Sequence, residues 1–259
     1  MTTTHPCDLA TRYAPVDHPG VDVPAALRPW AAPWPGYAPV DITPPELLGG
    51  LARSVAQGWA EPYATPQQVP DWPAQQAAAL VPFGFDENGW PLNPTGRTGR
   101  CGRNLGKWGE NQAADPIVTA GTGQDRRVLL IKRSDIGAWA IPGGMVDPGE
   151  SAPEALVREL FEETGVDLRD QAPEILERRY VEDWRASDYA WVTTTVALYT
   201  LPATVTAIAA DDAADAAWWP LTDLATLAAM LAPIGGLYPA HRILLATALA
   251  RLDNCAAAR

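Results

Sequence analysis

Cysteine, positive charge and long apolar runs are all scarce in this chain. Its three cysteines, Cys7, Cys101 and Cys255, lie far apart and form no CxxC pair, so we expect reduced thiols rather than a disulfide framework. The alanine-rich C-terminal segments are interrupted by polar residues and proline, and none is long enough to span a bilayer. Residues 1–20 lack the pattern of a signal peptide and of a transit peptide. These absences predict a cytoplasmic protein.

The shortage of positive charge excludes two further classes of protein. Lysine and arginine number 19 against 31 aspartates and glutamates, which gives a formal net charge of −12 at pH 7. A protein that binds nucleic acid or anionic lipid over a broad face needs the opposite balance. We therefore expect no nucleic-acid partner and no membrane partner, although a local basic pocket for a small anion remains compatible with this charge.

Proline is abundant only in the first part of the chain. Of the 26 prolines, 17 lie in residues 1–100, and this density excludes long helices there. Five tryptophans lie between these prolines: Trp30, Trp34, Trp59, Trp72 and Trp90. Because disordered chains are poor in aromatic residues, we expect an ordered, irregular N-terminal domain of short strands and turns over residues 1–116. A second domain then covers residues 117–259.

The second domain mixes strand and helix patterns. Apolar, β-branched runs predict strands at 127–133, 138–144, 175–181, 189–200 and 216–220. Helices are expected at 152–164, 222–231 and 239–252. The first of these helices has Ser151 as its N-cap, Glu154 in a capping box and Gly165 as its C-terminal stop. Such a mixture indicates a layered α/β or α+β fold.

Three glutamates share one face of the helix expected at 152–164. Glu159 lies three residues before Glu162 and four before Glu163, and residues at these spacings are neighbours on a helix. Each like-charged pair costs roughly 0.2–0.5 kcal/mol, which a divalent cation would offset because magnesium and manganese prefer carboxylate oxygens. Glu150 would approach the same face from the preceding loop. Taken alone, such an acidic run is more often a solvated surface.

The flanking residues favour the metal interpretation. From Gly144 the chain reads G-x5-E-x7-R-E-U-x-E-E-x-G-U, where U is aliphatic. The specified positions are Gly144, Glu150, Arg158, Glu159, Leu160, Glu162, Glu163, Gly165 and Val166. This pattern resembles a complete Nudix box. The resemblance implies the Nudix α/β/α sandwich and hydrolysis of a nucleoside diphosphate linked to another moiety. It also implies metal binding by the three helix glutamates, support from Glu150 and orientation of the glutamates by Arg158.

A cationic, glycine-rich segment precedes the second domain. Between Asn93 and Gly109 it holds Arg97, Arg100, Arg103 and Lys107 and no acid. Arginines pair with phosphate or carboxylate oxygens, so the segment would suit an anionic ligand. The alternative is a linker that salt bridges pin to the acidic second domain, as an interdomain latch beside the active site. Both interpretations stay open.

Residues 93–119, followed by IKRSDIGAWAIPGGMVDPGE, resemble the two-domain ADP-ribose pyrophosphatases of the Nudix superfamily. That family includes the ADP-ribose-binding domain of a melastatin-type cation channel. The upstream stretches WPGYAPVDITPPELL and WAEP have the same character. The resemblance implies substrate contacts by nine residues: Asp115, Arg133, Gly143, Met145, Asp183, Arg185, Asp188, Tyr238 and His241.

Two of the motifs behind these contacts also have ordinary structural explanations. YVEDWRASDYAW carries Asp183 and Arg185, with Trp184 where the family usually has proline; an ion pair on a surface hairpin is the alternative. GLYPAHR supplies Tyr238 and His241, which the resemblance places at the terminal ribose or its phosphate; a structural hydrogen-bonding histidine is the alternative.

The aspartates of the 210–221 loop are equally ambiguous. Asp211 and Asp212 match the family's Asp-Asp-Ala. One of them either helps to hold the nucleophilic water or forms a turn.

The expected reaction is magnesium-dependent hydrolysis of ADP-ribose to AMP and ribose 5-phosphate, with manganese as the alternative metal. Glu162 or Glu163 would assist in deprotonating the attacking water. We expect a monomer whose partner is this small-molecule substrate. One alternative is a Nudix enzyme for another dinucleotide or a nucleotide sugar, and another is a module that binds ADP-ribose without cleaving it. The complete set of acids favours the enzyme.

Overall fold

The computed structural model describes residues 19–49 and 51–257, so Cys7 lies outside the described residues. Its backbone contacts divide the chain into two compact units. Among the described residues, the first unit holds those up to Gln112 together with Arg179–Thr193, and the second holds Ala113–Arg178 and those from Thr194 onward. The predicted boundary lies at residue 116 and places residues 179–193 in the second domain, whereas the backbone contacts group that segment with the first unit.

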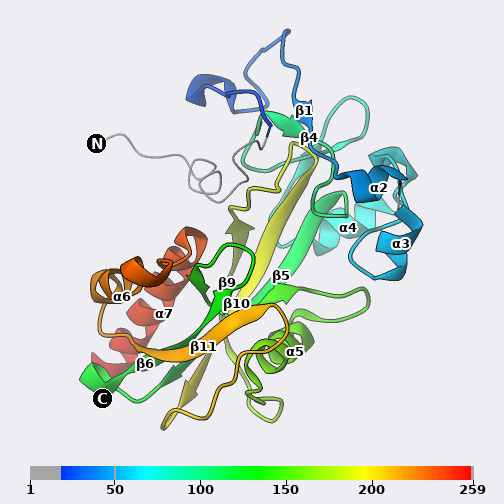
Figure 1. Cartoon of the computed structure of the whole chain (residues 1–259). Helices are drawn as coiled ribbons and strands as arrows, with labels where there is room; N and C mark the ends of the chain where they lie inside the picture. The colour runs from blue at the N-terminus through cyan, green and yellow to red at the C-terminus, as the bar shows by residue number, and fades with distance from the viewer. Residues whose placement is uncertain (1–18, 50, 258–259) are drawn as a thin grey trace. The chain divides into compact units, whose positions relative to one another are not determined.

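Short elements make up the first unit. Its two small sheets pair β1 (Val40–Asp41) with β4 (Arg100–Cys101) in parallel and β2 (Gly84–Phe85) with β3 (Pro91–Leu92) antiparallel. Its helices are α2 (Pro45–Gly49), α3 (Leu51–Ala56) and α4 (Trp72–Ala78), with 3-10 turns at Ala25–Leu27 and Pro66–Gln68. The expected short strands are therefore present (Figure 1), and the short helices are an additional feature that the sequence did not predict.

Aromatic side chains form the core of the first unit. Trp191 is fully buried, and its ring centroid lies 5.1 Å from that of Phe83. Phe83 meets Phe85 at 5.4 Å and Trp72 at 6.3 Å, each edge to face. Such pairs contribute about 0.5–1.5 kcal/mol each beyond the burial of their area. This packing gives a proline-rich region a core without long helices.

Two arginines of the cationic segment hold the first unit together from inside. The Arg97 guanidinium donates to the Leu27 carbonyl at 2.7 Å and lies over the Trp30 ring. Arg103 is 2% exposed and donates to the Glu61 carbonyl at 2.8 Å. Backbone carbonyls of their own unit thus accept hydrogen bonds from both arginines. The interdomain latch stays a prediction.

Asp188 holds the same segment from the other side. Its carboxylate is fully buried and accepts hydrogen bonds from the Tyr37 hydroxyl at 2.6 Å, the Thr98 amide at 2.7 Å and the Thr98 hydroxyl at 2.8 Å. The resemblance implies a substrate contact for Asp188. In the structure, protein donors surround the Asp188 carboxylate, and burial separates its oxygens from solvent.

A seven-stranded sheet supports the second unit. Its strands are β5 (Gly109–Ala120), β6 (Arg127–Arg133), β7 (Trp139–Ala140), β8 (Gly144–Met145), β9 (Glu174–Val181), β10 (Ala190–Leu201) and β11 (Ala213–Pro220). The order is β11-β6-β5-β10-β9, while β7 pairs with β6 and β8 pairs with β5. The helices are α5 (Ala152–Thr164), α6 (Leu224–Leu231) and α7 (Pro239–Ala257), with 3-10 turns at Gly123–Asp125 and Ala232–Ile234. Within the described residues, no helix combines the length and the apolar character needed to cross a bilayer.

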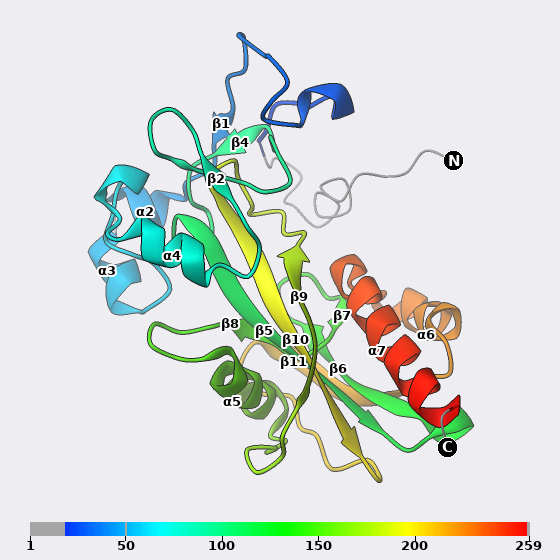
Figure 2. The same cartoon turned by 180° about the vertical axis from the view of Figure 1, so that it is seen from behind.

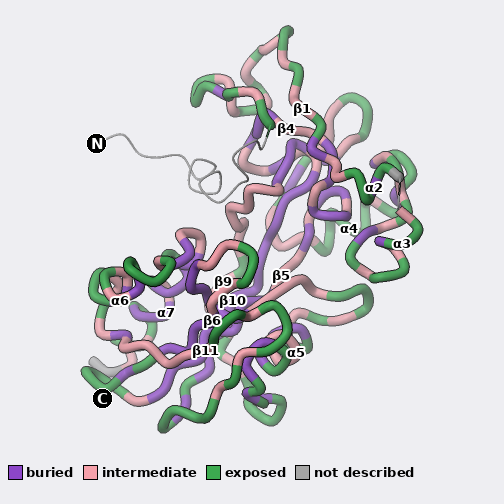
Figure 3. The backbone as a smooth tube through the Cα atoms, viewed as in Figure 1, coloured by how far each residue is buried: buried purple, intermediate pink, exposed green. Residues whose placement is uncertain are grey.

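Helices cover both faces of this sheet, and the alternation of strand residues explains why. Val128 of β6 belongs to a buried cluster with residues of α6 and α7, such as Leu245. The next residue, Leu129, belongs to a second cluster with residues of α5, such as Leu156, because successive side chains of a strand point to opposite faces. Figures 1 and 2 show α5 on one side and α6 with α7 on the other, and Figure 3 shows the buried strands between them. The expected α/β/α sandwich is confirmed.

The element bounds show where the sequence was informative. The strand at 127–133 and the helix at 152–164 have the predicted bounds. The strand expected at 138–144 is replaced by two shorter strands, because Gly143 has φ +149° and interrupts the extended backbone. β5 already begins at Gly109. Its first eight residues, GENQAADP, are largely polar, so they do not form the apolar run from which a strand was predicted.

The buried Asp188 should make stability depend on pH. Burial raises its pKa from 3.8 to about 6, so the native state favours the protonated form. The stability that it contributes is complete below about pH 4 and is lost as pH rises through about 6. Between these limits, wild-type protein should lose about 2–3 kcal/mol relative to Asp188→Asn. Urea unfolding across this range measures the difference. Asp22→Asn, at an exposed position, is the control, and parallel curves for wild type and Asp188→Asn would contradict the expectation.

Candidate active site

Helix α5 is fixed at both ends by its own sequence. Glu154 accepts hydrogen bonds from the Ser151 amide at 2.8 Å and the Ser151 hydroxyl at 2.6 Å, in the expected capping box. Gly165 ends the helix with φ 67°, a left-handed conformation that glycine adopts without strain. Leu156 and Leu160 are buried in the α5 cluster. The two ends and the buried stripe together set the direction of the acidic side chains.

Arg158 binds three of the predicted site glutamates at once. Its Nε and Nη2 each donate to a carboxylate oxygen of Glu150 at 2.8 Å. Its Nη1 donates to Glu159 at 2.8 Å and to Glu162 at 3.0 Å, and Nη2 also donates to the Met145 carbonyl at 2.9 Å. The bidentate pair raises the pKa of Arg158 and lowers the pKa of Glu150. Arg158 therefore ties the loop before α5 to the acidic face of the helix.

Two consecutive glycines contact the other side of the cluster. The Gly143 amide donates to a Glu163 carboxylate oxygen at 2.8 Å. Gly143 has φ +149°, and a side chain there would collide with the Ala114 carbonyl. A Cβ on Gly144 would collide with the Glu159 carboxylate. The absence of side chains therefore lets the loop backbone approach both carboxylates.

Glu159 and Glu163 are acids in an unfavourable environment. Glu163 is only 4% exposed. Burial raises the pKa of Glu159 to about 7 and the pKa of Glu163 to about 9, and the neighbouring Asp212 carboxylate adds to both shifts. A nearby positive charge would reverse such shifts, because it stabilises the ionised form. Strongly shifted acids of this kind are typical of functional sites.

The donor set suits a hard divalent cation, since carboxylate oxygens are the ligands that magnesium and manganese prefer. Among the described residues, however, no three histidine, cysteine, aspartate or glutamate side chains converge closely enough to hold a metal ion. Arg158 pairs with one carboxylate oxygen of Glu159 and one of Glu162.

Asp212 joins the cluster from the loop before β11. The sequence left it undecided between a water-holding residue and a turn. The structure shows turn geometry, with φ 53° at Asp211 and the Ser134 amide donating to the Asp212 carbonyl at 3.1 Å. It also shows the Asp212 carboxylate hydrogen-bonded to Glu163. The Asp-Asp-Ala match was the available signal, and it could not reveal which way the side chain points.

Asp115, Thr194 and His241 form a buried polar group in the same unit. The Thr194 hydroxyl donates to Asp115 at 2.6 Å, and His241 Nε2 lies 3.8 Å from the Asp115 carboxylate. His241 Nδ1 accepts from the Ile141 amide at 2.9 Å. Burial raises the pKa of Asp115 to about 6 and lowers the pKa of His241 to about 3. His241 is therefore neutral at pH 7.

Tyr238 connects this group to Arg133. The Arg133 guanidinium lies 5.2 Å from the centre of the Tyr238 ring and pairs with Asp135 at 2.7 Å. The rings of Tyr238 and His241 are nearly perpendicular, with centroids 5.0 Å apart. Four residues that the resemblance assigns to the substrate thus adjoin one another: Asp115, Arg133, Tyr238 and His241.

Asp183 and Arg185 belong to the first unit, as Asp188 does. The Arg185 guanidinium donates to both carboxylate oxygens of Asp183, at 2.9 Å and 2.6 Å, and the Arg185 amide donates to the same carboxylate at 2.8 Å. The Arg185 side chain remains 33% exposed. The predicted Asp-x-Arg is therefore a preformed ion pair with one partly accessible cation.

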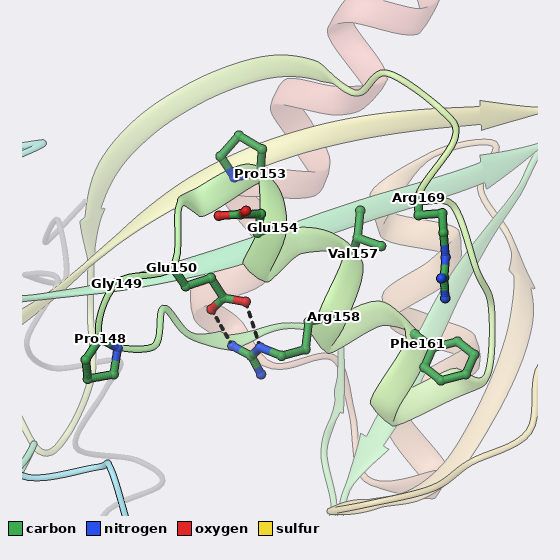
Figure 4. Close-up of a pocket in the computed structure, with 9 residues that line it drawn as sticks. All are labelled: Pro148, Gly149, Glu150, Pro153, Glu154, Val157, Arg158, Phe161 and Arg169. Carbon is green, nitrogen blue, oxygen red and sulfur yellow. Dashed lines mark hydrogen bonds and ion pairs between the residues drawn. The ribbon is translucent and has the colours of Figure 1, made fainter.

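A hollow of about 740 Å³ opens on the outer side of α5. Figure 4 shows Glu150 and Arg158 facing each other at one side of it. The other lining residues are Pro148, Gly149, Pro153, Glu154, Val157, Phe161 and Arg169. The Phe161 side chain is 48% exposed. The hollow therefore adjoins the Arg158 side of the cluster.

Two family models match the chain, one for each part. The model of the NUDIX domain matches residues 111–240. The model of the NUDT9-like N-terminal domain matches residues 23–109.

Several curated proteins are similar over most of the chain. A putative nudix hydrolase 6 from Caenorhabditis elegans is 38% identical over 193 residues, which cover 68% of this chain and 72% of that protein. The mitochondrial ADP-ribose pyrophosphatase of Rattus norvegicus is 32% identical over 238 residues, which cover 75% of this chain and 66% of that protein. A transient receptor potential cation channel, subfamily M member-like 2, from Nematostella vectensis is 31% identical over 84% of this chain and 16% of its own length.

Among solved structures, the NUDIX domain of Shewanella oneidensis NrtR complexed with ADP ribose is 24% identical, with a TM-score of 0.45 over 56% of this chain and 89% of that one.

The family models and the identity to curated relatives agree with the box on α5. The chain belongs to the Nudix hydrolase family and carries an NUDT9-like N-terminal domain before its Nudix domain.

Proposed function

We propose that this Nudix hydrolase cleaves the pyrophosphate of ADP-ribose to AMP and ribose 5-phosphate, with magnesium as the metal and manganese as the alternative. The carboxylate cluster carries the proposal. Glu159 and Glu163 have raised pKa values beside Asp212, and they face a loop whose backbone approaches them closely. A pyrophosphate with a divalent cation would supply the charges that this cluster lacks.

The choice of ADP-ribose is supported by the relatives. The rat protein is named for ADP-ribose pyrophosphatase activity, and the NrtR domain was crystallised with ADP ribose. The N-terminal domain matches a family model of its own, so the similarity to the two-domain type extends beyond the box. The Asp183–Arg185 pair and the Tyr238–His241 pair are the residues that we assign to the ribose 5-phosphate half.

We assign the metal to Glu159, Glu162 and Glu163. When bound, the cation would neutralise pyrophosphate oxygens and lower the pKa of a bound water. The chain itself contributes three things. Arg158 holds the carboxylates in place, Glu163 or Glu162 accepts a proton from the attacking water, and Arg185 stabilises charge on the leaving phosphate. Water oxygen forms the new bond to phosphorus, the bond from phosphorus to the bridging oxygen breaks, and the water protons pass to product and solvent.

A module that binds ADP-ribose without hydrolysis is the second candidate, since the channel relative covers most of this chain. A Nudix enzyme for another dinucleotide or a nucleotide sugar is the third. All the acids of the box are present in this sequence, and a sensor would not need to retain them.

Removing charge from the cluster should abolish turnover without unfolding the protein. Glutamine preserves the shape of glutamate but neither binds a cation strongly nor accepts a proton. Glu159→Gln and Glu163→Gln should each lower kcat/KM by about a hundredfold or more at saturating magnesium. Steady-state kinetics with a metal titration and circular dichroism provide the measurement. Glu87→Gln, at an exposed position of the first unit, is the control. Near-normal turnover in both helix variants would refute the metal assignment.

A single methyl group at Gly144 should also lower turnover without unfolding the protein. Its Cβ would occupy the place of the Glu159 carboxylate, so Gly144→Ala should lower kcat by about tenfold or more, because misplaced catalytic groups lose most of their effect. Gly144 has no positive φ, and the melting temperature should therefore change little. Gly36→Ala is the matched control, because a Cβ there meets no atom within 4 Å. Equal activity of the two alanine variants would show that the close approach is not required.

Arg185 should determine substrate preference. A hydrogen bond to a charged group contributes about 1.5–3 kcal/mol, so Arg185→Ala should lower kcat/KM for ADP-ribose by about ten- to a hundredfold. Substrate preference is measured as kcat/KM for ADP-ribose relative to kcat/KM for NADH and for a nucleotide sugar in the same assay. Arg169→Ala is the control, because Arg169 forms the same kind of pair with Asp167 two residues earlier. Wild-type protein that cleaves all three substrates equally well would leave the Nudix assignment intact and remove the ADP-ribose assignment.

A further inference from the structure

His241 is bonded to the loop that contacts the carboxylates. Its Nδ1 accepts a hydrogen bond from the Ile141 amide at 2.9 Å, and its side chain is 10% exposed. A ring nitrogen accepts a hydrogen bond only when it carries no proton, so the proton of the neutral imidazole lies on Nε2. That Nε2–H faces the Asp115 carboxylate at 3.8 Å. The distance is too long for a hydrogen bond, but the negative charge favours this tautomer.

The bond from Ile141 to His241 extends a row of backbone bonds. The Trp139 amide donates to the Gly236 carbonyl at 2.8 Å, and the Tyr238 amide donates to the Trp139 carbonyl at 2.7 Å. Helix α7 begins directly after Tyr238, so its backbone no longer follows the strand. The His241 side chain takes the place of a backbone carbonyl in this row and accepts the hydrogen bond of the Ile141 amide. This amide is buried and would otherwise lack an acceptor.

Only Pro142 separates Ile141 from Gly143. Proline fixes its own φ, so a displacement of Ile141 passes to Gly143 with little absorbed between them. The Gly143 amide donates to Glu163 at 2.8 Å, and the backbone of Gly144 lies against the Glu159 carboxylate. The first turn of α7 is thus connected to the carboxylate cluster by contiguous contacts.

From these contacts we infer that His241 is a positioning residue that acts through Ile141 and Pro142 to place the Gly143 amide against Glu163. This role uses Nδ1, whereas a contact with the ribose or its phosphate would use Nε2. The inference depends on the proposed function only for its kinetic readout.

Substitution of His241 by asparagine or by glutamine distinguishes the roles of its two ring nitrogens, Nδ1 and Nε2. The Oδ1 of asparagine takes the place of Nδ1 and can accept from the Ile141 amide. The glutamine amide reaches the place of Nε2 and leaves the position of Nδ1 without an acceptor. Positioning through Nδ1 predicts that His241→Asn keeps its metal affinity and kcat within about threefold of wild type. His241→Gln should lose about tenfold or more in both, as is typical when an outer contact of a metal site is removed. Arg242→Gln, at the exposed neighbouring position, is the control.

Two measurements do not depend on turnover. Amide hydrogen exchange of residues 138–146 should accelerate about tenfold or more in His241→Gln and remain near wild type in His241→Asn. Manganese affinity, titrated by calorimetry without nucleotide, should follow the same order. In the kinetics, His241→Gln should lower kcat and leave KM within about threefold. If ADP-ribose is not a substrate, the exchange and manganese measurements still decide the inference.

The wild-type protein supplies a further check that needs no variant to fold. Nitrogen-15 NMR of the imidazole should show the Nε2–H tautomer with an unprotonated Nδ1 at pH 7. A proton on Nδ1 would overturn the inference. So would equal exchange and equal manganese affinity in the two variants, or a His241→Gln protein in which both quantities are normal.

Discussion

Carboxylates buried beside one another are unstable in the ionised form, and the Nudix unit is organised around that instability. Glu159 and Glu163 are held where burial and Asp212 both favour protonation. The chain offsets this with one guanidinium, from Arg158, and one backbone amide, from Gly143. Neither partner neutralises the whole cluster. The cluster therefore still favours an added positive charge, which would stabilise the ionised carboxylates.

The first unit presents the opposite problem, because its buried charges are largely positive. Arg97 and Arg103 direct their guanidinium groups to backbone carbonyls and aromatic faces. Asp188 receives two hydroxyls and an amide. A run of arginines between glycines can therefore signal an interior that lacks regular secondary structure, where side-chain donors satisfy carbonyls that no helix or sheet has paired.

Local patterns were sufficient to predict part of the structure from sequence. The ends of α5 follow from Ser151, Glu154 and Gly165, whose hydrogen bonds all lie within or beside the helix. The fold followed from the apolar, β-branched runs of the strands, from the helix patterns between them and from the family resemblance. The polar start of β5 and the short helices of the first unit could not be predicted, because tertiary contacts rather than apolar periodicity stabilise them. Likewise, the direction of the Asp212 side chain depends on a loop that sequence cannot orient.

The contacts of Arg158 all lie between Met145 and Glu162. A stretch this short can adopt its geometry on any sheet that accepts the buried side of α5. The groups assigned to the ribose half instead come from Asp183–Arg185 and Tyr238–His241, which are distant in sequence and belong to different units. The Arg158 network is therefore encoded as one contiguous peptide, whereas the groups proposed to set ligand choice are distributed along the chain. Substitutions that change ligand choice can therefore leave the Arg158 network unchanged.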